Sequence, residues 1–160
     1  GTLSLDGQGM LSLPPSARRA IRLSQCGLVF QDFALLDYLT VEQNILLPLR
    51  LSARLQKEHA SQARKMAEQL DIDRYWQKLT SELSQGERQR VAIVRALVHA
   101  PKLVLADEPT ASLDSKRKRL ALDLLVNYAR TTGAALVMVT HDVELFARLD
   151  RVTNLEDWTA

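Results

Sequence analysis

Apolar residues follow two different patterns along the chain, and the change from one to the other divides it into three parts. Short continuous apolar runs occur at residues 28–30, 103–106 and 134–140. Runs of this length predict strands, and the last two are typical of parallel strands covered by helices on both faces. From residue 41 to residue 100 the apolar residues recur at helical spacing instead. The pattern therefore predicts an α/β fold interrupted by an all-helical insert.

Capping and helix-breaking residues mark the ends of the predicted helices. Thr40 and Gln43 have the spacing of a capping box, which predicts a helix from residue 41 through residue 51, slowed or kinked at Pro48. A later helix at residues 116–130 should stop before Gly133. Apolar positions on the predicted helices that should be buried are Ala63, Met66, Ala67, Leu70, Leu120, Leu124 and Val126.

The first residues predict a small α/β element that precedes the helical insert. Residues 3–5 read as a strand that turns at Asp6 and Gly7, and a short helix should follow at residues 16–21. The predicted organisation is one domain over residues 1–160. Its α/β core would comprise residues 1–32 and 101–160, and its helical subdomain residues 33–100.

Composition narrows the class of protein only slightly. The 160 residues are 46% hydrophobic and 25% charged, as in ordinary soluble domains, and a net charge of +2 gives no electrostatic reason to expect nucleic acid as a partner. The basic run at residues 116–119 is better explained as a solvated helix face than as a phosphate site. Cys26 is the only cysteine, so an internal disulfide is excluded. We expect Cys26 to be a small buried hydrophobic residue.

Ser84, Gln85, Gly86 and Glu87 form the first of two chemically informative segments. Ser84 and Glu87 have capping-box spacing, so a helix should begin here with unpaired N–H groups and partial positive charge at its start. Such an end binds anions, and Gly86 would let a phosphate approach the backbone closely. By itself a capping box usually marks only the start of a helix.

The second segment is the strand at residues 103–106, which leads directly into Asp107, Glu108 and Pro109. Two adjacent carboxylates at the carboxyl end of a strand suit metal-nucleotide chemistry. Asp107 can hold Mg²⁺ directly or through water, and Glu108 can orient and deprotonate an attacking water. An acidic loop after a core strand is common, but here His141 also closes the next predicted strand.

The chain resembles the ATP-binding cassette (ABC) ATPases in five motifs that occur in the order of that family. The matching segments are residues 29–31 (Q-loop), 83–97 (signature helix), 103–109 (Walker B), 112–114 (D-loop) and 140–142 (H-loop). The resemblance extends from Gly1 to about Asp157. The sequence around Asp107 is most similar to that of the lipoprotein-release, macrolide-efflux and cell-division group of bacterial ABC ATPases.

The resemblance implies a role for each matching residue, with ATP and Mg²⁺ as cofactors. Glu108 would be the general base, His141 the γ-phosphate sensor and Asp107 a ligand of Mg²⁺. Gln31 would contact Mg²⁺ or the attacking water. The residues implied to bind nucleotide across a head-to-tail dimer, or to organise its interface, are Ser84, Gln85, Gly86, Glu87 and Asp114.

The same resemblance implies partners and a location. The partners would be the transmembrane subunits of a transporter and a second nucleotide-binding subunit, at the cytoplasmic face of the bacterial inner membrane, with no nucleic acid. Residues 32–48 would dock on the transmembrane subunits. Phe33, Leu35 and Leu36 are candidates for apolar contacts there, although each could equally belong to the core. His59 and His99 match no motif and are expected at the surface or at helix ends.

The sequence departs from the family pattern in the signature and in the P-loop. Gln85 replaces the usual first glycine, and Glu87 replaces a common glutamine. No G-x-x-x-x-G-K-[ST] motif occurs in the 160 residues. The matching region of the family begins just after the P-loop helix, so we expect an incomplete cassette that does not hydrolyse ATP alone. We also expect an open strand edge where the P-loop strand would pair.

Two other classes of function remain open from the sequence. One is a soluble ABC ATPase that acts on DNA or ribosomes, a class that tends to carry coiled-coil insertions, tandem cassettes or basic tracts. The other is a degenerate, non-catalytic cassette that serves as an interaction module. Glu108 and His141 argue against long-standing loss of catalysis, whereas the lack of a P-loop motif argues for it.

Overall fold

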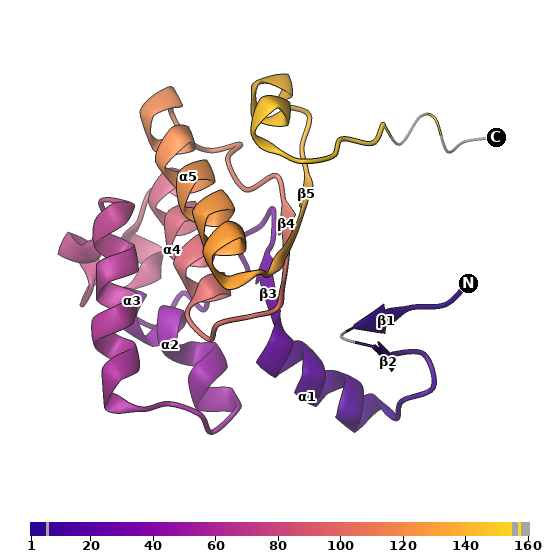
Figure 1. Cartoon of the computed structure of the whole chain (residues 1–160). Coiled ribbons are helices and arrows are strands. Elements are labelled where there is room, and N and C mark those ends of the chain that lie inside the picture. Colours follow the sequence, from indigo (N-terminus) through magenta and orange to yellow (C-terminus); the bar gives the residue numbers. More distant parts are fainter. Residues whose placement is uncertain (6, 155–156, 158–160) are drawn as a thin grey trace.

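Three parallel strands form the centre of the protein, with helices packed against one face. We describe a computed structural model of the chain, covering all residues except 6, 155–156 and 158–160. The sheet has the order β3-β4-β5, with β3 at Cys26–Val29, β4 at Leu103–Asp107 and β5 at Ala135–Val139 (Figure 1). In parallel register, Leu28 lies opposite Leu105, and Leu105 opposite Val137. The predicted α/β fold is confirmed.

The remaining elements follow in chain order. A two-stranded hairpin, β1 (Ser4–Leu5) and β2 (Gln8–Gly9), precedes α1 (Pro15–Gln25). Between β3 and β4 lie α2 (Val41–Leu51), α3 (Lys57–Gln69) and α4 (Gln85–Leu97). Helix α5 (Ser115–Thr132) joins β4 to β5. Short 3-10 turns occupy Asp73–Tyr75, Thr80–Glu82 and Val143–Arg148.

Helix α2 has the predicted range, whereas α1 and α5 extend beyond the predicted residues 16–21 and 116–130. Thr40 caps α2 with a reciprocal capping box to Gln43, and Pro48 lies inside that helix. Gly133 ends α5 in the left-handed conformation. The predicted turn at residues 6–7 falls partly on Asp6, which lies outside the described residues. The predicted buried positions are confirmed in part, because Ala63, Ala67, Leu70 and Val126 are buried, whereas Met66, Leu120 and Leu124 are half-buried.

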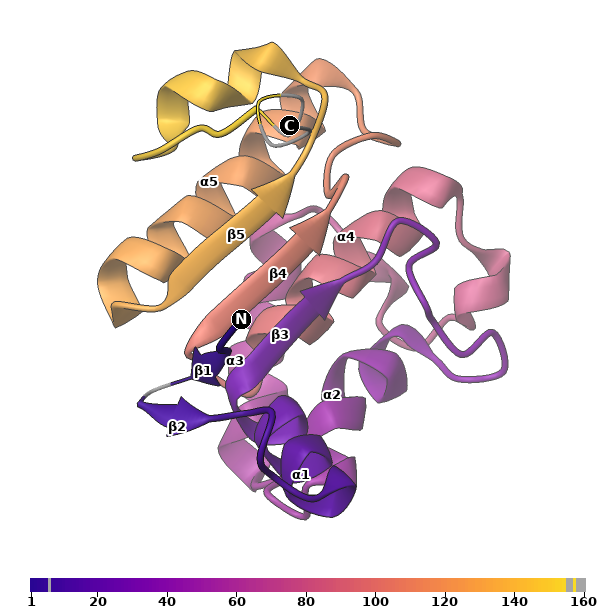
Figure 2. The same ribbon diagram turned by 90° about the vertical axis from the view of Figure 1, so that its right-hand side faces the viewer.

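The prediction that the strands are covered on both faces is wrong for the described residues. Helices α4 and α5 lie together behind the sheet in Figure 2, and Val104 and Ala106 are buried against them. On the other face Val137 and Val139 are about half exposed. Right-handed crossovers that advance in one direction place both helices on the same face. Among the described residues, β5 is paired on one side only, as expected for an open edge.

His99 lies just past the end of α4, as expected, but it is buried rather than on the surface. Its Nε2 lies 3.1 Å from the carbonyl oxygen of Cys26, which joins α4 to β3. Burial lowers the pKa of the His99 imidazole and raises the pKa of the Cys26 thiol. His59 belongs to the start of α3, where its Nδ1 accepts from the Gln56 N–H at 2.9 Å. No helix in the described part of the chain is long and apolar enough to cross a bilayer.

Candidate nucleotide site

The predicted metal-binding residues lie together at the carboxyl ends of β3 and β4. Gln31 follows β3, Asp107 is the last residue of β4, and parallel strands present their carboxyl ends at one edge of the sheet. An open hollow of about 510 Å³ is lined by Phe30, Gln31, Asp32 and Asp107. We call it the strand-end hollow. Amide and carboxylate oxygens are the ligands that suit Mg²⁺, so these residues fit the predicted metal.

Glu108 and His141 are in direct contact next to this hollow. The Glu108 carboxylate accepts a hydrogen bond from the His141 backbone N–H at 3.0 Å, and its Oε1 lies 2.7 Å from His141 Nδ1. The Thr140 hydroxyl donates to the same carboxylate at 3.4 Å. The Glu108 side chain is 16% exposed and that of His141 82% exposed. The carboxylate is therefore held in place from one side, while the imidazole is open to solvent.

The backbone of Glu108 is strained. Its φ is 46°, in the left-handed region that residues other than glycine occupy at a cost of about 1–3 kcal/mol. The Glu108 N–H donates to the carbonyl of Val139 at 2.9 Å, which continues the pairing of β4 with β5 past the end of the strand. A strained conformation fixed by neighbouring strands is typical of functional sites.

The signature turn, residues 84–87, forms the start of α4 and, among the described residues, is not hydrogen-bonded to Glu108 or His141 through Ser84 or Glu87. The Ser84 hydroxyl and its N–H both donate to the Glu87 carboxylate at 2.8 Å, and the Glu87 N–H donates back to Ser84 Oγ at 3.4 Å. Burial alone would raise the pKa of the Glu87 carboxyl, but hydrogen bonds from Tyr75 and Ser84 lower it overall. Gln85 is exposed at the helix start.

The structure gives a reason for glycine at position 86 that was not apparent from the sequence. A Cβ at this position would lie 2.9 Å from the carbonyl oxygen of Ser112 in the D-loop. The first turn of α4 therefore packs against the D-loop of the same chain. Asp114, at the end of that loop, is the N-cap of α5 and accepts from the Arg117 N–H at 3.0 Å. This hydrogen bond, and the one from the Arg117 side chain, lower the pKa of the Asp114 carboxyl.

Comparison with known proteins identifies the family. A model of the ABC transporter family matches residues 1–111. The chain belongs to the ABC transporter family. The lipoprotein-releasing system ATP-binding protein LolD of Shewanella denitrificans is 37% identical, over 98% of this chain and 67% of its own length. An uncharacterized ABC transporter ATP-binding protein of Escherichia coli K12, YbbA, is 39% identical over 97% of this chain and 68% of its own.

The fold agrees with this assignment. A dimeric post-hydrolysis structure of the ATP-binding cassette MJ0796, bound to ADP and Pi, superposes with a TM-score of 0.82 and 36% identity. The superposition covers 91% of this chain and 64% of the cassette. The chain thus spans about two thirds of the length of the relatives that it matches. The chain is therefore related to the ABC transporter ATP-binding subunits of the lipoprotein-release group.

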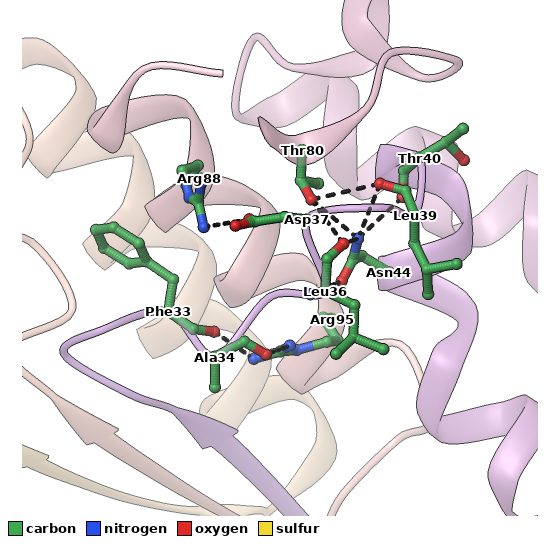
Figure 3. Close-up of polar contacts among 10 residues, drawn as sticks. All are labelled: Phe33, Ala34, Leu36, Asp37, Leu39, Thr40, Asn44, Thr80, Arg88 and Arg95. Carbon is green, nitrogen blue, oxygen red and sulfur yellow. Dashed lines mark hydrogen bonds and ion pairs between the residues drawn. The ribbon is translucent and has the colours of Figure 1, made fainter. Parts of the chain in front are cut away.

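The segment that follows the Q-loop of this ABC protein is fixed to the signature helix, as Figure 3 shows. The buried Arg95 of α4 donates to the carbonyls of Phe33 and Ala34 at 2.6 and 2.5 Å. Phe33 and Ala34 have φ values of 65° and 46°. Arg88, also on α4, pairs with Asp37 at 2.6 Å. Two arginines of one helix therefore hold a loop whose backbone is strained at two consecutive positions.

A second network holds the same segment against the helical insert. The buried side chain of Asn44 donates to the carbonyls of Leu36 and Leu39 at 3.0 and 3.2 Å, and Thr80 donates to Leu36 at 2.9 Å. Of the three apolar residues considered for docking, Leu35 packs against the core, while Phe33 and Leu36 are half-buried. Tyr38, which the sequence did not single out, is 73% exposed.

Sequence reasoning missed two residues of α4, Gln89 and Arg95. Both lie within the signature helix, residues 83–97, but neither was given a role there, and both are buried polar side chains that bind backbone groups of other loops. A polar residue on the buried stripe of a predicted helix is the available signal, because such a group must find a partner inside the protein.

Proposed function

We propose that this chain provides the signature and hydrolytic residues of a subunit that hydrolyses ATP to power a bacterial ABC transporter. The observation that carries the proposal is the contact between the Glu108 carboxylate and His141, beside the strand-end hollow. A carboxylate that is fixed in orientation, next to a metal-suited pair of side chains, matches the needs of water activation for phosphoryl transfer.

In this proposal each residue of the chain has one task. Glu108 orients the attacking water and accepts its proton at a carboxylate oxygen. His141 holds that carboxylate through its backbone N–H and Nδ1, and its exposed ring would contact the γ-phosphate of a bound nucleotide. Asp107 and Gln31 would hold Mg²⁺, which would neutralise phosphate charge. A positioned general base contributes about 10²–10⁴ in rate.

The signature turn serves a second nucleotide. Ser84 and Gly86, together with Gln85 and Glu87, contact the γ-phosphate held by the opposite subunit of a head-to-tail dimer, and Asp114 organises the interface. Ser84 and Gln85 are exposed at the start of α4, and the N-terminus of a helix attracts phosphate. The dimeric state that the name of the MJ0796 structure gives for that cassette supports this arrangement.

Membership of the ABC transporter family supports a proposal for the partners and the location. We infer that residues 32–48 dock on transmembrane subunits at the cytoplasmic face of the bacterial inner membrane. The exposed Tyr38, and the hydrogen bonds by which Arg95 holds the backbone of Phe33 and Ala34, support a docking role. The name of LolD, a protein of lipoprotein release, favours the same group of transporters for this chain.

Measuring ATP hydrolysis by two proteins tests the proposal. The first is the 160-residue chain, and the second is a P-loop chimera, in which the P-loop segment of an ABC relative precedes Gly1. We expect turnover from the chimera and none from the chain alone, since the chain has no motif that cradles the β- and γ-phosphates. A folded chimera that binds ATP but does not hydrolyse it, with Glu108 in place, would refute the proposed function.

A further inference from the structure

A buried glutamine joins the loop of the proposed base to the D-loop. Gln89 of α4 is 1% exposed. Its Nε2 donates to the carbonyl oxygen of Glu108 at 2.7 Å, and its Oε1 accepts from the N–H of Ser112 at 2.9 Å. One amide group thus bridges the residue after the Walker B strand and the first residue of the D-loop. Both of its polar atoms are paired in a site away from water.

This bridge acts on the strained part of the site. Glu108 has φ of 46°, and the direction of its carbonyl depends on that conformation. A hydrogen bond from a buried amide to this carbonyl stabilises the left-handed backbone, which in turn aims the carboxylate toward His141. If the amide were lost, the Glu108 carbonyl and the Ser112 N–H would each lose a partner, and the carbonyl would keep the longer hydrogen bond from the Ala111 N–H at 3.3 Å.

The bridge also reaches the signature turn. Gln89 lies three residues after Gly86, so both are on one side of α4. Gly86 packs against the Ser112 carbonyl so closely that a Cβ would lie 2.9 Å from it. The first turns of α4 therefore contact the D-loop twice, once through backbone packing and once through the Gln89 amide. A displacement of the signature turn would be transmitted to the backbone of Glu108.

We propose that Gln89 is a positioning residue that fixes Glu108 for hydrolysis and couples it to the signature turn. The inference rests on the proposed function, because it concerns the same base. Gln89 does not reach the nucleotide itself; it acts through the Glu108 carbonyl and the Ser112 amide. In a head-to-tail dimer the signature turn serves the opposite nucleotide. Gln89 would thereby link the occupancy of one site to the geometry of the base in the other.

The test compares three variants in the P-loop chimera. Gln89→Met removes both hydrogen bonds at similar volume, and Gln89→Glu, assayed at a pH where its carboxyl is ionised, keeps an acceptor for Ser112 but has no donor for Glu108. Val94→Ala, at a buried position of the same helix, is the control for a purely structural defect. We expect both Gln89 variants to lower kcat by about 10- to 100-fold with little change in KM for ATP. Val94→Ala should leave kcat unchanged at temperatures where the protein is folded.

A second comparison identifies the route of the effect. In a Glu108→Gln background the Gln89 variants should lower kcat no further, because residues that act through one another are not additive. Gln89 variants that lose stability like Val94→Ala but keep the parent kcat would overturn the inference. If Glu108→Gln itself leaves hydrolysis unchanged, the proposed function fails instead.

One measurement is independent of folding defects and of activity. Hydrogen exchange of the unmodified 160-residue chain, followed by NMR, reports the Ser112 amide directly. The residue itself is exposed, so protection of its N–H requires the bond to Gln89. We expect slow exchange at Ser112, and exchange at the rate of an unstructured amide would overturn the bridge.

Discussion

Replacing Glu108 with glutamine in the P-loop chimera should lower kcat for ATP hydrolysis by about 10²–10⁴-fold, the contribution of a positioned general base. The substitution keeps the size of the side chain and its ability to accept a hydrogen bond from the His141 N–H. It removes the negative charge and the site that accepts the proton of the attacking water. Binding of Mg-ATP should persist, because the phosphate-binding groups are unchanged.

Steady-state phosphate release at saturating ATP measures this effect, and a neighbouring carboxylate provides the control. Glu144 is exposed three residues after His141, and its backbone N–H donates to Asp142 at 3.1 Å. Glu144→Gln should therefore leave kcat within about twofold of the parent, as is usual for surface substitutions. Equal turnover by the parent and Glu108→Gln would exclude Glu108 as the base.

Gly27→Ala should destabilise the 160-residue chain by about 3 kcal/mol, near the upper end of the usual cost of overpacking. Gly27 lies on β3 where the strand contacts α4. A Cβ added there would lie 2.2 Å from the carbonyl oxygen of Ala96 and 3.0 Å from Cγ of Pro101. Neither neighbour is the end of a flexible side chain, so the strand and the helix would have to separate. The free energy of unfolding, obtained from urea denaturation, measures the change.

Gly9→Ala is the matched control for this substitution. The atom nearest to a Cβ at Gly9 is Ser12 Oγ at 3.8 Å, an ordinary contact. We expect a change within about 0.5 kcal/mol for this variant. If Gly27→Ala were as stable as Gly9→Ala, the close packing of β3 on α4 described here would be incorrect.

Local signals in the sequence predicted most of the fold, because they act over a few residues. The capping boxes at Thr40 and Ser84 and the left-handed Gly133 are present as expected. The helices that the patterns indicated are real but extend further, as in α1, which continues to Gln25. Pairing order was not predictable from these signals, since it depends on how the crossovers advance across the sheet.

Sequence patterns did not predict the exposed face of the sheet or the burial of His99. A continuous apolar strand indicates two covered faces. In the described structure both crossover helices occupy one face, and Val137 and Val139 remain about half exposed. His99 carries no periodic signal that distinguishes a surface histidine from one that binds the Cys26 carbonyl. Both outcomes depend on contacts between segments far apart in the sequence.

The candidate site likewise has residues that the sequence predicts and contacts that only the structure shows. Asp107, Glu108 and His141 could be found because their motifs place them at the ends of strands, which meet at one edge of the sheet. Their contacts could not be read from spacing, and the left-handed backbone of Glu108 is visible only in the structure. Gln89 and Arg95 were missed because they bind backbone groups, which every residue has, so no residue type in the sequence marks their partners.

Isothermal titration of Mg-ATP shows whether the 160 residues, which hold hydrolytic and signature residues, bind nucleotide without a P-loop motif. The titration uses the chain, confirmed as folded, and the P-loop chimera under the same conditions. We expect saturable binding of micromolar affinity by the chimera and no saturable binding by the chain. Micromolar, saturable binding by the chain alone would contradict this expectation, because another part of these residues would then cradle the phosphates.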